Sequence, residues 1–210
     1  MIRRNKGDEH LAGWKPDLKA PKHTFWLPVE SDRPLKELGR EAALKILGIG
    51  TPEDRLEKFA RVIRDGTQAS RNRGVMMGGL IFFPDFGRLP PIAQVEVSGG
   101  YSREPGKPSS LEFYRENFGT PDKDTVGQVE VTDLQLPAGP AIRFHRRFWP
   151  KQSWDPIAHQ WEEVSFAVRP PQISDTVLLT VSWVEFKFSE ALINAADAIA
   201  PTLAIRVDDA

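Results

Sequence analysis

The sequence predicts an α+β protein in which an antiparallel sheet of about six or seven strands packs with helices as an α/β/α sandwich. The last third carries most of this prediction. Apolar and polar residues alternate through AIRFHRRFW, QWEEVSFAVRP and DTVLLTVSWVEF, as in strands with one buried face. The segment SEALINAADAIAP then predicts a helix from about Ser189 to Ala200 with one apolar face. That face must dock on the sheet to leave water.

The N-terminal region differs in composition from the rest of the chain. Residues 1–24 are rich in Lys, Asp, Pro and Gly, so we expect an irregular arm that Trp14 anchors to the body. Residues 25–210 are then expected to form a single α+β domain. The apolar segment Phe25–Leu27 ends at Pro28 and suits an edge strand, where a missing backbone donor is tolerated.

Two helices are expected next. Ser31 or Asp32 can cap the first, which carries Pro34 in its first turn and ends near Gly48. The second begins at the cap and first-turn sequence TPED, and it shows apolar residues at helical spacing. Gly66 marks either close packing or an early end of this helix. The apolar residues are Leu56, Phe59, Ala60 and Ile63.

The strands of the sheet begin near Met76. MMGGLIFFP and PIAQVEVSG read as two strands, and Gly78 and Gly79 indicate a bulge or the close approach of another group. Residues 100–125 are rich in Gly, Pro, Ser and charge, so we expect an excursion from the sheet. GQVEVTDLQL resumes the sheet. Possible apolar anchors of the excursion are Leu111, Phe113, Tyr114 and Phe118.

Composition excludes several classes of function. Lys and Arg total 28 against 29 Asp and Glu, so the net charge of −1 gives no electrostatic basis for nucleic-acid binding. The chain has no cysteine, which excludes disulfides, thiolate catalysis and Fe–S clusters. None of the four histidines shows a metal-ligand spacing, so we expect neither a metal nor another cofactor.

Catalytic and targeting motifs are also missing. The DFG of PDFGRLPP lacks the other kinase motifs and reads as part of a Pro-rich turn. The charged start MIRRNKGDEHLAGW does not predict a signal peptide. No stretch approaches the roughly 18 apolar residues of a membrane helix. We therefore expect a cytoplasmic protein without membrane insertion.

Two phrases resemble a group of actinobacterial proteins without assigned function. These are LPAGPAIRF and, about 50 residues later, FSEALINAADAIAPTLAI, whose ending shows Asp197, Ile199, Ala200 and Leu203 in the group's pattern. The order of elements over residues 25–207 also resembles the PsbP-like fold. That resemblance implies an antiparallel sheet between helices and a binding or assembly role; it implies no catalytic residue. Some proteins of the group are secreted lipoproteins, whereas this chain shows no leader.

A basic row is the first candidate site. Period-two alternation places Arg143, His145 and Arg147 on one face of a strand. Glu163, or Glu162 with a bulge, is expected opposite this row on the next strand. Two interpretations follow: a cationic groove for an acidic partner or small anion, or a solvated face with cross-strand ion pairs. The second is the more ordinary one.

An aromatic loop is the second candidate site. Trp149, Trp154 and Trp161 fall within thirteen positions, together with two prolines. Tryptophan is enriched at protein-contact hot spots because it removes a large apolar area from water. The alternative is that the indoles pack on the end of the sheet or on Trp14. We predict that this loop contacts a protein partner.

The sequence therefore leaves two hypotheses for the function. The first is a non-enzymatic protein-binding or assembly module that uses the aromatic loop and the basic row. The alternative is a small-molecule enzyme with a pocket at the sheet edge near His145, for which a deep, closed pocket around that residue is the discriminating observation.

Overall fold

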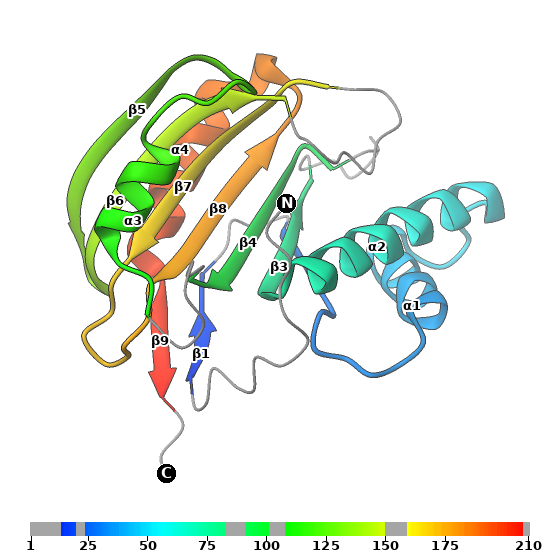
Figure 1. The fold of residues 1–210 in the computed structure, drawn as a ribbon. Coiled ribbons are helices and arrows are strands. Elements are labelled where there is room, and N and C mark those ends of the chain that lie inside the picture. Colours follow the sequence, from blue (N-terminus) through cyan, green and yellow to red (C-terminus); the bar gives the residue numbers. More distant parts are fainter. Residues whose placement is uncertain (1–13, 20–23, 83–90, 101–107, 150–158, 208–210) are drawn as a thin grey trace.

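The computed structural model describes residues 14–19, 24–82, 91–100, 108–149 and 159–207 (Figure 1). Its main feature is a seven-stranded antiparallel sheet in the order β2-β3-β4-β8-β7-β6-β5. The α+β fold and its antiparallel sheet are confirmed. The strands are β2 (Thr24–Leu27), β3 (Val75–Ile81), β4 (Ala93–Gly99), β5 (Thr125–Leu136), β6 (Gly139–Phe148), β7 (Trp161–Val168) and β8 (Val177–Trp183).

Helices cover both faces of this sheet. α4 (Ser189–Ile199) lies on one face, and its bounds match the expected helix within a residue. α1 (Leu35–Leu47), α2 (Glu53–Arg73) and α3 (Leu111–Phe118) lie on the other (Figure 1). The result is the α/β/α sandwich that the sequence predicts.

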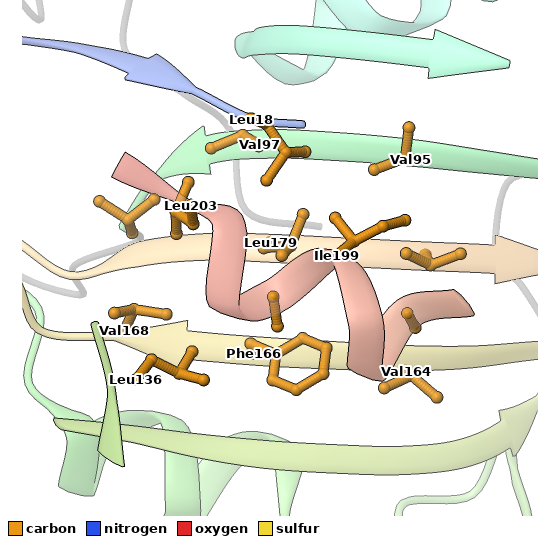
Figure 2. Close-up of a cluster of buried hydrophobic side chains, with 14 of the residues drawn as sticks. Leu18, Val95, Val97, Leu136, Val164, Phe166, Val168, Leu179, Ile199 and Leu203 are labelled. Carbon is orange, nitrogen blue, oxygen red and sulfur yellow. The ribbon is translucent and has the colours of Figure 1, made fainter. Parts of the chain in front are cut away.

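The largest core lies between the sheet and α4. Val95, Val164 and Leu179 come from the central strands and are fully buried, as alternate positions facing one layer should be. Figure 2 shows Ile199 and Leu203 over these strands; both are 2% exposed. Burying side chains of this size contributes about 1.5–3 kcal/mol each, so the helix and the sheet stabilise one another.

Two smaller cores lie on the opposite face. Phe59 and Ile63 of α2 pack with Leu80 of β3, and Tyr114 of α3 packs with Phe144 of β6. The anchors expected in residues 100–125 are therefore part of a helix, which the sequence analysis did not predict. Ser110 caps this helix by accepting a hydrogen bond from the backbone N–H of Phe113 at 3.1 Å.

The expectation of an irregular arm over residues 1–24 is wrong for its described part. β1 (Trp14–Asp17) pairs antiparallel with β9 (Ala204–Val207), a strand that the sequence analysis also missed. Trp14 is buried in the core beneath α4, as an anchor should be. The pairing joins segments nearly 200 residues apart, which no local pattern encodes. The division into an arm and a domain otherwise stays a prediction.

Gly79 marks close packing, whereas a side chain at Gly66 would make only ordinary contact and the helix does not end there. α2 continues past Gly66 to Arg73, and a Cβ at Gly66 would lie 3.7 Å from the Leu27 side chain. A Cβ at Gly79 would lie only 2.9 Å from the Trp26 indole. The indole therefore packs directly on the β3 backbone, which only glycine permits.

Truncation after Glu185 is expected to abolish folding, because it removes α4 and β9 from the largest core. The lost burial is a large share of a typical net stability of about 5–15 kcal/mol. Circular dichroism and thermal unfolding of the truncated chain provide the measurement. Unchanged unfolding would contradict the docked-helix packing.

A single substitution tests the same packing with a smaller change to the core than the truncation makes. Ile199→Ala is expected to lower the free energy of unfolding by about 2–5 kcal/mol, since it leaves a cavity beneath α4. Glu190→Ala is the control on the exposed side of the same helix, and its effect should stay within about 0.5 kcal/mol. Equal effects in denaturant unfolding would show that the buried face is not what docks the helix.

Candidate functional site

The basic row on β6 faces α4 and is paired throughout. Arg143 donates to both carboxylate oxygens of Asp197 on α4, at 2.7 and 3.2 Å. His145 lies between two carboxylates: its Nε2 is 2.8 Å from Glu162 and its Nδ1 is 3.1 Å from Glu130. Arg147 lies 3.3 Å from Glu162. The row is thus an ion-paired face partly covered by a helix.

Glu162 is the centre of this cluster and is fully buried. One carboxylate oxygen accepts from His145 and Arg147. The other accepts from the Trp183 indole at 3.1 Å and from the Ser189 hydroxyl. A buried carboxylate is stable when its lone pairs are satisfied in this way. The cluster joins β6, β7 and β8 to the first residue of α4.

Burial and hydrogen bonding act in opposite directions on Glu162. Burial raises its pKa by disfavouring the charged form, while donation from Ser189, then from His145 and Arg147, lowers it. The donors prevail, and the pKa of Glu162 lies below its ordinary value. The carboxylate is therefore held ionised, as an anchor for the donors around it.

The strand register corrects the expectation of which acid lies opposite the basic row. Arg147 pairs with Glu162 and Arg146 with Glu163, without a bulge. Glu163 accordingly points to the opposite face of the sheet, where Arg146 donates to it at 2.7 Å. The register is fixed by pairs such as Phe148 with Trp161 at the loop end, which sequence alternation does not define.

The structure places two of the three candidate tryptophans at the end of the sheet. Trp149 follows β6 and is 48% exposed, while its backbone N–H donates to the Asp124 carbonyl at 2.8 Å. Trp161 begins β7 and is half-buried; its indole N–H is buried without a hydrogen-bond partner. Trp154 lies outside the described residues, as does the PDFGRLPP turn.

The same end of the sheet gathers exposed apolar side chains. Six large hydrophobic residues are exposed in the part of the chain that the structure describes, and Val126, Trp149 and Val184 are three of them. Val126 pairs with Arg147 across β5 and β6, and Val184 directly follows β8. We call these three residues, with Arg147, the sheet-end patch. The Arg147 guanidinium lies 5.1 Å from the Phe186 ring centre.

A cavity of about 310 Å³ lies at the other edge of the sheet, away from His145. Its apolar lining comes from β1, β2, β3 and the segment after β2, and we call it the edge cavity. No local sequence pattern predicts this cavity, because β1 and β3 are far apart in the chain. Its apolar lining includes Pro16, Trp26, Val29, Met76 and Met77.

Metal and membrane features can be assessed over the described ranges. There, no group of three or more His, Asp or Glu side chains is arranged to hold a metal ion. Among the helices that the structure describes, none combines the length and hydropathy of a membrane-spanning segment. The expectation of no cofactor stays a prediction.

Glu162→Gln is expected to destabilise the fold by roughly 2–4 kcal/mol, since it removes a buried charge that satisfies four donors. It should also change the pH dependence. With its folded pKa lowered, Glu162 contributes stability above the unfolded pKa of about 4.3, and this is lost as the pH falls through the folded pKa. Urea unfolding of both proteins between pH 3 and pH 7 measures both effects.

Glu130→Gln is the matched control. Glu130 contacts the same histidine, but its side chain is 69% exposed, so its loss should cost less than about 1 kcal/mol. Two results would contradict this prediction: an equal loss of stability in both variants, or the same acid-unfolding profile for the wild type and Glu162→Gln. Either would show that the contribution of Glu162 to stability does not come from its buried charge.

Comparison with known proteins places the fold but not a family. No protein-family model and no curated protein matches the chain. A solved structure is similar, that of LpqN, involved in cell envelope biogenesis of Mycobacterium tuberculosis. Identity is 14%, the match covers 96% of this chain and 87% of that chain, and the TM-score is 0.50. At this identity the likeness concerns the fold alone: the chain shares the α+β fold of LpqN.

Proposed function

We propose that this chain is a non-enzymatic protein-binding or assembly module that contacts its partner through the sheet-end patch. The observation that carries the proposal is that Val126, Trp149 and Val184 are exposed and lie at the same end of the strands β5, β6 and β8. Apolar side chains that cluster on a surface mark interaction sites more often than scattered ones do.

The patch has a rigid base, which favours binding. The backbone of Trp149 is tied to Asp124, and β6 beneath it pairs with β7 in continuous register from Ala141 to Phe148. A contact residue held in place loses little conformational freedom on association. Trp149 thus combines a large apolar area with a fixed position, as hot-spot residues do.

We assign supporting roles to the other candidate residues. Arg147 has a side chain 45% exposed, so it can reach a partner while bound to Glu162. Arg143 and His145 are 14% and 17% exposed and hold the strand against α4 and Glu130. They position Arg147 rather than form a cationic groove. The proposed contact also includes Trp161, the first residue of β7, and Trp154, which lies outside the described residues.

The alternative of an enzyme near His145 receives no support from the geometry. Both ring nitrogens of His145 lie against carboxylates, which leaves neither directed at a substrate. The edge cavity shares no residue with this cluster. An acid–base role requires a ring nitrogen within reach of a substrate proton.

The structural similarity to LpqN points to a cellular process in which the proposed module could act. LpqN is involved in cell envelope biogenesis, a process that a binding or assembly module could serve. The PsbP-like resemblance implies a role of the same kind. The cytoplasmic location and the actinobacterial relationship remain predictions.

Trp149→Ala is expected to weaken partner association by about 2 kcal/mol, roughly 30-fold, as hot-spot truncations do. Affinity purification from the native cell, with quantitative mass spectrometry, identifies proteins that the wild-type chain retains. Binding of the retained protein to each variant is then measured by titration. Retention of that protein by Trp149→Ala at full affinity would contradict the proposal.

Ile49→Ala is the control, because Ile49, like Trp149, is an exposed apolar residue but follows α1, away from the patch. It should leave association unchanged. Equal loss with both variants would indicate nonspecific apolar adsorption. Thermal unfolding of Trp149→Ala should match the wild type, which separates a lost contact from a lost fold.

A further inference from the structure

The wall of the edge cavity is held in place from outside. Arg71 of α2 reaches the segment that follows β2 and donates to three of its carbonyls: that of Val29 at 3.0 Å, that of Pro28 at 3.1 Å and that of Ser31. One guanidinium with several donors fixes a short segment well because its fork is planar. The wall is thus preformed, and a ligand need not order it.

The cavity floor is apolar and adaptable. The Trp26 indole lies on the backbone of Gly79, and Met76 and Met77 line the floor beside it. Methionine side chains adjust to different apolar shapes because they are unbranched and polarisable. The volume of about 310 Å³ lies at the small end of ligand sites, about 300–1,000 Å³. The floor therefore suits one or two apolar side chains.

Two opposite charges border the same cavity. Lys15 of β1 and Glu30 of the preformed wall both line it and are exposed. Neither side chain forms an ion pair or hydrogen bond with any residue that the structure describes, although most charged residues near the sheet are paired. Among the described residues, the site thus offers a cation and an anion without partners beside an apolar floor.

We propose that the edge cavity binds a zwitterionic apolar ligand, namely an apolar amino acid or dipeptide with both ends free. Its carboxylate would lie near Lys15, its ammonium near Glu30, and its apolar side chain on Trp26 and the methionines. A purely apolar ligand would leave both charges unused, and an anionic or cationic one would meet one charge of its own sign. This site is independent of the sheet-end patch.

The proposal is tested with a set of probes that share one apolar body. The probes are leucyl-phenylalanine, its N-acetyl form, which lacks the ammonium, and its amide, which lacks the carboxylate. Binding to the full chain is measured from the shift of the Trp26 indole N–H resonance, assigned with Trp26→Phe. The free dipeptide is expected to bind about two- to five-fold more tightly than either capped form, because each capped form loses one exposed charge pair.

Charge-reversal variants test where the carboxylate and the ammonium of the ligand lie. Lys15→Glu is expected to weaken the free dipeptide by about three- to ten-fold and to leave the amide unchanged or tighter. Glu30→Lys should do the same for the free dipeptide and leave the N-acetyl form unchanged or tighter. Both residues are exposed, so the fold should tolerate the changes. The control is Lys36→Glu, an exposed lysine on α1 outside the cavity lining.

Three outcomes would overturn the proposal. The first is that no probe shifts the Trp26 indole resonance at millimolar concentration. The second is that the capped probes bind as tightly as the free dipeptide. The third is that Lys36→Glu weakens binding as much as the cavity variants do. That result would show that the loss of affinity comes from the net charge of the protein and not from the cavity.

Discussion

The burial of one sheet face under α4 is the interaction on which the rest of the structure depends. Strands β4, β8 and β7 present fully buried aliphatic side chains to this helix, and Trp14 of β1 enters the same core. The packing fixes which face of each strand points inward. Alternation then assigns the polar side chains of the regular parts of the sheet to a face. The positions of both proposed sites follow from this assignment.

The polar cluster around Glu162 belongs to the same interface. The basic row of β6 points toward α4, so its charges must be compensated at the interface with this helix. Glu162 supplies that compensation for His145 and Arg147, and Asp197 supplies it for Arg143. Trp183 and Ser189 donate to the Glu162 carboxylate and hold it in place. A compensated row stabilises a specific docking of the helix, whereas a free row would attract anions. The cluster is therefore structural, and the two proposed sites lie at the end and the edge of the sheet.

Sequence patterns identified most elements but not the functional geometry. The alternation of β6 placed Arg143, His145 and Arg147 correctly on one face, because period two is a local property. The partner acid was wrong by one position, because strand register depends on pairing across a twelve-residue connection. The short helix α3 was missed since its anchors lie in a polar segment, although Ser110 ahead of Leu111 is a cap pattern that could have indicated it.

The sequence by itself determined the fold class, the bounds of α4 and the exclusion of thiol chemistry, because these depend on local period and on residue types present or absent. Tertiary structure alone decided the β1–β9 pairing, the burial of Glu162 and the edge cavity. Each of these joins residues far apart in the chain: Lys15, Glu30 and Met77 line one cavity only once β1 has paired with β9 and packed beside β3. Contacts of that range follow from how layers pack, which no single segment encodes.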